Sequence, residues 1–283
     1  MTDKNIKTLV GDIYGLFTDK KTEAFSEDSI RDFSERLGRK ISTRVSDERS
    51  SPALRLSNIG TPCRRQLYYR INSPESAEPL PPEARIKFLF GDILEELLLW
   101  LATEAGHTVK GEQDEVTFHG VKGHRDAIID GHLVDAKSAS SYSFNKFASH
   151  LTPDGDAFGY IPQLQTYLRS SEEDTDLRDK DAASFLVIDK TLGKITLDTH
   201  EKDSVDYEGK VDELREILAK DKPPPRDFAP EPFGKSGNEK LPVVCSYCPF
   251  KKLCYPHVRT FVYSTGPVYL TKISRLPDVP EVT

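Results

Sequence analysis

Two aspartates and a lysine near the middle of the chain have the spacing of a carboxylate site. Asp130-Gly131 predicts a two-residue hairpin, because a type I′ turn needs positive φ at both central positions. Folding the chain there places Asp126 opposite Asp135, and Lys137 points to the same face. Opposed carboxylates repel each other unless a cation lies between them. The pattern therefore predicts a divalent-metal site; the alternative is a solvated hairpin whose charges align by chance.

The chain has four cysteines, which make a second candidate site: Cys63, Cys245, Cys248 and Cys254. The last three are spaced C-x2-C-x5-C near the end of the chain. A disulfide framework is not expected in a cytoplasmic protein of this size, whereas four thiolates are a complete ligand set for Zn²⁺ or for a 4Fe–4S cluster. Three near cysteines and one distant one favour the 4Fe–4S cluster, with Zn²⁺ as the alternative. Either centre would have at least a structural role.

Polar residues in two predicted helices complete the set of candidates. Glu95 and Glu96 interrupt an apolar segment, and a buried glutamate is costly unless it is paired or coordinated. Glu95 is therefore a candidate third carboxylate, while an outward-facing helix edge is an equal alternative for Glu96. Gln163 and Tyr167 are four residues apart and share one helical face. They would bind a phosphate or orient the lysine; the alternative is an ordinary polar helix surface.

Hydrophobic spacing predicts the elements that would hold these residues. Helices are expected at 6–17, 30–37, 61–70, 83–105, 161–169 and 205–218, and strands at 109–118, 185–189 and 194–198 beside the hairpin. Thr61-Pro62 is expected to supply the N-cap and first residue of the 61–70 helix. Residues 222–232 contain five prolines and are expected to be an extended strap. Helix, strands, helix and strand in this order indicate an α/β core.

Composition narrows the class of protein. The chain has 283 residues and a net charge of −7, which argues against a protein that simply coats nucleic acid. The segment from Arg31 to Arg70 is nevertheless basic, with ten Lys or Arg and four Asp or Glu. No signal peptide or bilayer-spanning apolar run is visible, so a globular protein in a reducing cytoplasm is expected, with no membrane partner.

Together these motifs resemble the PD-(D/E)XK nuclease superfamily, in particular its RecB-like branch with an iron–sulfur cluster, which includes AddB-type nucleases and the exonucleases of CRISPR adaptation. The resemblance covers roughly residues 57–256 and keeps the family's motif order. Glu95 stands where many members have His, and Asp135-Ala136-Lys137 reads D-x-K, where E-x-K is commoner. The resemblance implies a restriction-endonuclease-like αβββαβ core, a mixed sheet flanked by helices, with a helical N-terminal extension and a C-terminal cysteine strap.

The resemblance also implies roles for individual residues. Glu95, Asp126, Asp135 and the Ala136 carbonyl would hold Mg²⁺ or Mn²⁺, and Lys137 would orient a water or offset developing charge. Gln163 and Tyr167 would position the DNA strand. Three further residues are candidates for DNA contact: His124, which the hairpin register places opposite Lys137, and Arg64 and Arg65. For His124, a surface histidine without a ligand is the alternative.

The expected function is metal-dependent hydrolysis of DNA, most simply as an exonuclease acting at ends or on single strands in recombination, repair or degradation. A helicase or recombination protein is an expected partner, and the cytoplasm (the host's, for a viral protein) the expected location. Two alternatives are a catalytically quiet module that binds DNA or a partner, and a zinc-stabilised endonuclease or resolvase. The expected organisation is an extension over 1–50, a nuclease core over 51–260 closed by the cluster, and a tail over 261–283.

Overall fold

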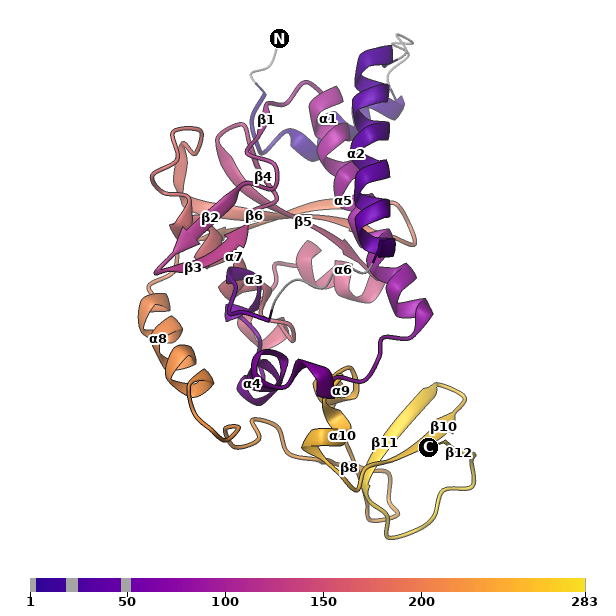
Figure 1. The fold of residues 1–283 in the computed structure, drawn as a ribbon. Helices are drawn as coiled ribbons and strands as arrows, with labels where there is room; N and C mark the ends of the chain where they lie inside the picture. Colours follow the sequence, from indigo (N-terminus) through magenta and orange to yellow (C-terminus); the bar gives the residue numbers. More distant parts are fainter. Residues whose placement is uncertain (1–3, 19–24, 47–51, 283) are drawn as a thin grey trace. The chain divides into compact units, whose positions relative to one another are not determined.

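The computed structural model of the protein describes residues 4–18, 25–46 and 52–282, so parts of the expected 1–50 extension lie outside the described residues. The chain divides into two compact units, each built from separate stretches of sequence. The first unit comprises residues 1–60 and 81–209, and the second comprises residues 61–80 and 210–283 (Figure 1). These units differ from the expected division at residues 50 and 260, because the 61–80 segment belongs with the C-terminal part of the chain.

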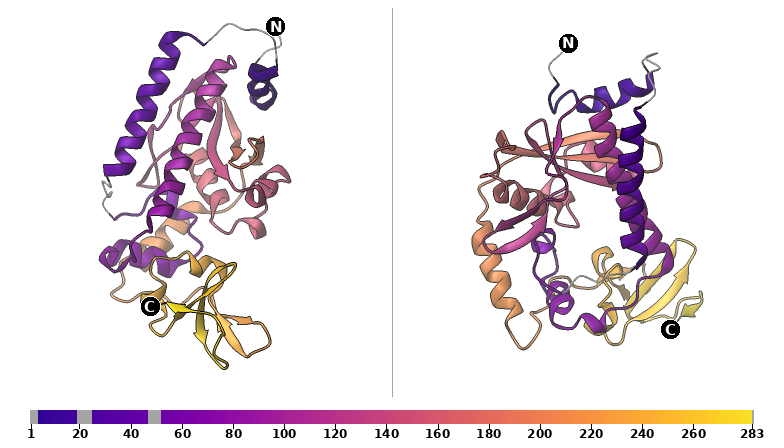
Figure 2. Two further views of the ribbon diagram at one scale, coloured as in Figure 1. Left: turned by 90° about the vertical axis from the view of Figure 1, so that its right-hand side faces the viewer. Right: turned by 45° about the horizontal axis from the view of Figure 1, so that its top comes forward.

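The first unit contains a five-stranded mixed sheet with helices on both faces (Figures 1 and 2). Its helices are α1 (Leu9–Thr18), α2 (Glu27–Ser46), α3 (Leu56–Ile59), α5 (Pro82–Glu104), α6 (Ser141–Ala148) and α7 (Tyr160–Ser170), with a 3₁₀ turn η2 (Pro153–Gly155). Its strands are β1 (Val109–Lys110), β2 (Glu115–Phe118), β3 (Val121–His124), β4 (Ala127–Ile129), β5 (His132–Ala139), β6 (Asp179–Asp189) and β7 (Ile195–Glu201). The prediction of a mixed α/β fold is confirmed.

The sheet has the strand order β1-β4-β5-β6-β7, in which only β5 and β6 are parallel. α1 and α5 cover one face, where Leu9, Leu98, Val134 and Leu186 share one apolar core. α6 and α7 cover the other face, and Phe147 of α6 lies 5.3 Å from a β6 ring, Phe185, between ring centroids. Because successive strand residues face opposite sides, each residue of β5 is assigned to one of these two layers.

The β4–β5 hairpin has the predicted register, with Ala127 opposite Val134 and Ile129 opposite His132. Asp130 and Gly131 both have positive φ, at 53° and 83°, as a type I′ turn requires. The ladder ends at Ala127, however, and the preceding residues form a separate two-stranded ribbon, β2–β3. The expected strand over 109–118 is therefore two strands in different sheets.

The second unit contains a small antiparallel sheet beside the cysteine segment. Its elements are α4 (Arg64–Asn72), η1 (Pro74–Ser76), β8 (Glu231–Phe233), β9 (Asn238–Lys240), α9 (Val243–Ser246), α10 (Lys251–Cys254), β10 (Arg259–Tyr263), β11 (Gly266–Lys272) and β12 (Glu281–Val282). The strand order is β12-β10-β11-β9-β8. The expectation of a tail over 261–283 is wrong, because most of these residues pair as strands. α8 (Tyr207–Leu218) lies across the sequence boundary between the units.

For two of the predicted helices, the expected first and last residues can be compared with the structure. The 83–105 prediction matches α5, which begins at Pro82 and ends one residue before its C-cap, Ala105. The helix expected at Thr61 instead begins at Arg64, with Cys63 as the N-cap, since the Cys63 sulfur accepts the Gln66 N–H at 3.4 Å. Within the described residues, no helix is both long and apolar enough to cross a bilayer.

Candidate active site

Asp126, Asp135 and Lys137 meet at the start of the β4–β5 hairpin, within the first unit. Asp126 Oδ2 accepts the Ala136 N–H at 2.8 Å, which fixes this carboxylate beside β5 although it lies outside the ladder. The Asp135 carboxylate forms an ion pair with the Lys137 ammonium group two residues along the same strand. The structure therefore brings together the two carboxylates and the amine that the hairpin arithmetic predicts.

The two faces of β5 separate the charged residues from the apolar core. Val134 and Ala136 belong to the core beneath α1 and α5. Asp135 and Lys137 face α7 instead, where Lys137 Nζ lies 5.6 Å from the centroid of the Tyr160 ring. The Asp135 side chain is only 6 % exposed, so its charge depends on the neighbouring lysine for compensation.

The first turns of α7 bring Gln163 to the same site. Asp156 caps this helix by accepting the N–H groups of Tyr160 and Ile161, at 2.9 and 2.8 Å. With the helix fixed in this way, Gln163 Nε2 lies 3.4 Å from Asp135 Oδ1. Tyr167, one turn further, is buried, and both burial and the nearby Asp135 raise its pKa. The prediction that Gln163 and Tyr167 share one helix face agrees with these positions, and the face lies toward Asp135.

Glu95 of α5 is the third carboxylate, and two residues that the sequence did not single out hold it in place. Gln113 Nε2 donates to Glu95 Oε1 at 2.9 Å and lies 3.4 Å from Asp126 Oδ1, so this amide bridges the two acids. Lys40 of α2 contacts Glu95 at 2.8 Å and Glu96 at 3.4 Å. Positive φ at Gln113 (58°) marks a turn, but the sequence contains no local signal that links it to Glu95.

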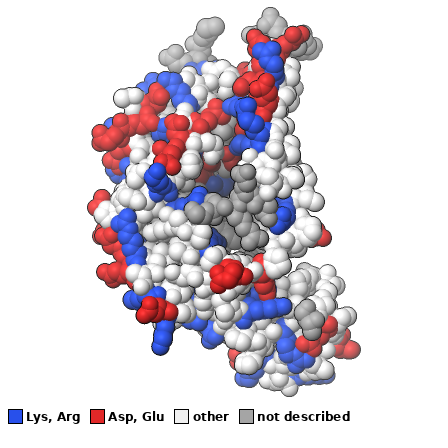
Figure 3. Space-filling view, viewed as in Figure 1, with Lys and Arg blue, Asp and Glu red and all other residues white. Residues whose placement is uncertain are grey.

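Acidic and basic side chains are interspersed along α2, at the upper right of Figure 3, and several of them pair with α5. Arg36 contacts Glu96 at 3.0 Å, and Arg44 contacts Asp92 at 2.6 Å. The alternative for Glu96, a water-facing helix edge, is wrong, because this side chain is 4 % exposed and is paired with two cations. Glu95 is the glutamate directed at the aspartates.

The electrostatic environment raises the pKa of all three carboxyl groups. Burial and then the neighbouring Asp126 raise the pKa of Glu95 to about 7. Burial and then Asp135 raise the pKa of Asp126 to about 6, and burial also raises the pKa of Asp135. Burial opposes the charge of Lys137, but Asp135 and Asp126 outweigh this effect, so its pKa is raised and the amine stays protonated. Three crowded acids beside two lysines, Lys137 and Lys40, are deficient in positive charge, since Lys40 also pairs with Glu96.

These pKa values predict how the stability of the metal-free protein depends on pH. The raised pKa values mean that the folded protein binds more protons than the unfolded chain between about pH 4.5 and 7. The free energy of unfolding should therefore fall as the pH rises through this range. Urea denaturation at a series of pH values will measure the slope, and Glu95→Gln should reduce it. An unchanged slope in that variant would contradict the assignment of Glu95.

Mn²⁺ should act in the opposite direction, because a metal binds the ionised carboxylates. The increase in melting temperature on adding Mn²⁺ should be larger near pH 8 than near pH 5.5.

The donor set of the site fits Mg²⁺ or Mn²⁺. Carboxylate oxygens are the ligands that these ions prefer, and a divalent cation would supply the missing positive charge. The Ala136 carbonyl stays a predicted ligand; the N–H of the same residue donates to Asp126.

The residues proposed to contact DNA have different surroundings. His124 is exposed but pairs with Glu115 on β2, so the expectation that it lies opposite Lys137 is wrong. Arg125 explains the difference. This buried residue contacts Asp114 and belongs to neither β3 nor β4, so the strand pairing of the hairpin does not continue to His124. Arg64 and Arg65 belong to the second unit. Arg64 pairs with Asp227 at 2.7 Å and Arg65 donates to the Pro224 carbonyl at 2.8 Å, so both have internal partners.

The four cysteines line one cavity in the second unit, together with Tyr69 and Phe250. All four are free thiols, although Cys63 is far from the others in sequence. Burial, and then repulsion by the other thiolates, raises the pKa of Cys245 to about 12, and burial raises that of Cys248 to about 11. Thiols crowded in this way ionise readily only with a metal present, so the set fits either of the predicted centres.

No family model and no curated protein matches the sequence. Among solved structures, one described as "Crystal structure of SSO0001" aligns with 78 % of this chain and 95 % of that chain, at 19 % sequence identity and with a TM-score of 0.41.

Proposed function

We propose that the protein is a metal-dependent DNA nuclease of the PD-(D/E)XK type, acting on DNA ends or single strands. The observation that carries the proposal is the convergence of Glu95, Asp126 and Asp135 beside Lys137, from helix α5, the residue just before β4, and strand β5. A binding module needs no such set, because like charges at close range destabilise a fold that gains nothing else from them.

Each residue would have a distinct part in hydrolysis of a phosphodiester bond. Glu95, Asp126, Asp135 and the Ala136 carbonyl would hold Mg²⁺ or Mn²⁺, which activates water and stabilises charge on a phosphate. Lys137 stays protonated because of its aspartate neighbours, so it stabilises the negative charge that develops on the phosphate oxygens. Gln163, at 3.4 Å from Asp135, holds that carboxylate and offers its amide to the substrate strand.

A cavity of about 220 Å³ beside Lys137 supports a single strand as the substrate. Lys146 and Lys190 line it and would meet phosphates, while Phe158 and Tyr160 offer ring faces on which bases stack. The cavity lies between α6 and the start of α7, next to the lysine of the candidate site. Cations and aromatic rings side by side are the combination that binds single-stranded nucleic acid without sequence preference.

The wider proposal keeps the features that the resemblance implies. The α5–β4–β5–α7–β6 arrangement, with β5 and β6 parallel, supports a restriction-endonuclease-like core. The four thiols support a 4Fe–4S cluster that closes the cysteine strap, with Zn²⁺ as the alternative. A recombination or repair role, a helicase partner and a cytoplasmic location belong to the same proposal.

Digestion of end-labelled linear DNA and of closed circular DNA, each with Mg²⁺ or Mn²⁺ and with a chelator control, tests the function. Metal-dependent release of nucleotides from linear DNA with intact circles would support an exonuclease. Nicked circles would support the endonuclease alternative with the same chemistry. Binding without cleavage of either substrate, by protein with a complete cluster, would overturn the nuclease and support a binding module.

A further inference from the structure

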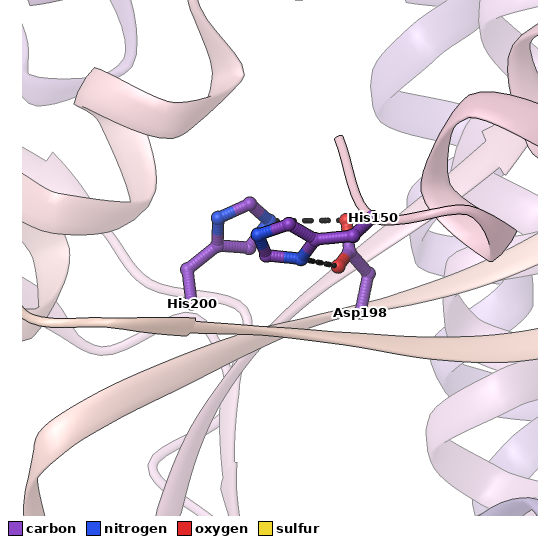
Figure 4. Close-up of side chains that lie close together, drawn as sticks. All are labelled: His150, Asp198 and His200. Carbon is purple, nitrogen blue, oxygen red and sulfur yellow. Dashed lines mark hydrogen bonds and ion pairs between the residues drawn. The ribbon is translucent and has the colours of Figure 1, made fainter. Parts of the chain in front are cut away.

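A second group of ligand-type side chains lies outside the candidate active site: His150, Asp198 and His200 (Figure 4). Among the described residues, this is the one group of three or more His, Cys, Asp or Glu whose ligand atoms all lie within 4.8 Å of one another. His150 Nδ1 is 2.8 Å from Asp198 Oδ1, and His200 Nε2 is 3.0 Å from Asp198 Oδ2. Both imidazole rings therefore direct a nitrogen at one carboxylate.

Local structure brings these three side chains together. Asp198 and His200 are two residues apart on β7, so they share the face that α6 covers. His150 follows the end of α6 and has a φ of 67°, a left-handed conformation that is uncommon for a residue other than glycine. The next residue, Leu151, is buried, and its N–H donates to Asp198 Oδ2 at 3.0 Å. The loop is thus anchored on the aspartate by His150 and by the residue that follows it.

We propose that His150, Asp198 and His200 bind one divalent transition-metal ion of the Zn²⁺ class, independently of the Mg²⁺ or Mn²⁺ site. Two imidazole nitrogens and one carboxylate oxygen are a common ligand set for Zn²⁺, with a fourth position left for water. The donor set distinguishes the two sites, because imidazole selects Zn²⁺, Ni²⁺ or Cu²⁺ whereas an all-oxygen set selects Mg²⁺ or Mn²⁺.

The geometry needs little change to accept the ion. In a tetrahedral site with bonds of about 2.05 Å, neighbouring ligand atoms are roughly 3.3 Å apart. The observed separations of 2.8 and 3.0 Å join the two imidazole nitrogens to different oxygens of Asp198, and one ligand atom from each of the three residues lies within 4.8 Å of the others, so side-chain shifts would bring both nitrogens and one oxygen around an ion. Each imidazole would then present a lone pair at that nitrogen and carry its proton on the other one.

The surroundings also favour an ion over a purely hydrogen-bonded cluster. The rings stack with centroids 4.5 Å apart and planes at 24°, so both ligand nitrogens stay on the same side. The Leu151 N–H donates to Asp198 Oδ2 at 3.0 Å, so this carboxylate is held in place beside the two rings. The His150 side chain is 59 % exposed, so an ion and its water can enter from solvent. A bound ion would tie the end of α6 to the edge strand β7.

Calorimetric titration of the full-length, cluster-containing protein with Zn²⁺ tests the site. The wild type should bind one more equivalent of Zn²⁺ than His150→Ala, and His124→Ala, which removes another exposed histidine of the same unit, should bind as the wild type does. Because His150 packs no core, its removal should leave the fold intact. Mn²⁺ binding at the carboxylate site should be the same in all three proteins.

Histidine imidazole NMR signals provide the second measurement, which separates this site from the thiols. Zn²⁺ should shift the His150 and His200 signals of the wild type at one equivalent, and should shift neither signal in Asp198→Asn. Equal Zn²⁺ stoichiometry in the wild type and in His150→Ala, or unmoved imidazole signals at saturation, would overturn the proposal. The cluster would then be a hydrogen-bonded one only.

Discussion

Lys137→Ala should reduce Mg²⁺-dependent cleavage of DNA by about 100- to 1000-fold, the effect of removing one preorganised group that stabilises transition-state charge. Among the described residues, Lys137 is the single amine that forms an ion pair with Asp135, and it is largely buried beside Tyr160, so none of the other described cations occupies its place. Steady-state digestion of end-labelled DNA at saturating Mg²⁺ will measure the loss. The main effect is expected on kcat, because Lys137 acts on charge that develops during the reaction.

The control for this prediction is Lys180→Ala, which removes an exposed lysine of β6. Its activity should equal that of the wild type. Circular dichroism should show both variants folded, although Lys137→Ala leaves Asp126 and Asp135 without their cation and should raise the pKa of each further. Undiminished cleavage by folded Lys137→Ala would refute the assignment of the active site, whatever the metal.

Cys254→Ala should remove the metal centre and destabilise the second unit by more than about 4 kcal/mol, a loss typical of a structural metal site. Among the described residues, the buried apolar cluster beside the thiols is small, with Tyr68, Tyr69, Cys248 and Phe250 as its buried members, so the metal centre would contribute much of the local stability. Iron, sulfide and zinc analysis together with visible absorption will identify the centre in the wild type and measure its loss. A broad visible band that bleaches on reduction indicates the 4Fe–4S cluster, and colourless protein whose zinc is lost in Cys254→Ala but kept in His150→Ala indicates the alternative.

Tyr247→Ala is the matched control, because this residue lies between Cys245 and Cys248 in the sequence and its side chain is 77 % exposed. It should keep the metal and the melting temperature of the wild type. A Cys254→Ala protein that is fully metallated and as stable as the wild type would exclude a four-thiolate site. In that case Cys254 would be a half-buried thiol next to a site of different composition.

Sequence reasoning succeeded where the information is local. The Asp130-Gly131 turn determines the register of the hairpin, and a period of two then places Asp135 and Lys137 on one face. Gln163 follows from helical periodicity in the same way. These patterns need only the immediate neighbours of each residue, which is why they could be read from one sequence.

The contacts that sequence reasoning missed depend on tertiary packing. Lys40 and Gln113 reach Glu95 from other elements, and no spacing rule relates them to it. The Asp198-x-His200 pair was visible as two ligand-type residues on one strand face, but His150 lies 48 residues before Asp198. The C-terminal strands were missed because proline-rich and turn-rich sequence between short strands predicts loops, while pairing among strands decides the outcome.

Ionic strength should have two opposite effects on the candidate site, because α2 is attached to α5 partly by ion pairs. One end of α2 is held by ring stacking, with the Phe33 and Trp100 centroids 4.7 Å apart, and salt barely affects such a contact. The other end is held by Lys40 and Arg44 on carboxylates of α5, and salt screens these pairs. For the proposed nuclease, added salt should weaken the ion pair between Lys40 and Glu95 and so free that carboxylate for a metal, while it should also weaken binding of DNA phosphates. We therefore expect an activity maximum at intermediate salt, and removal of the Lys40 amine should move that maximum toward lower salt.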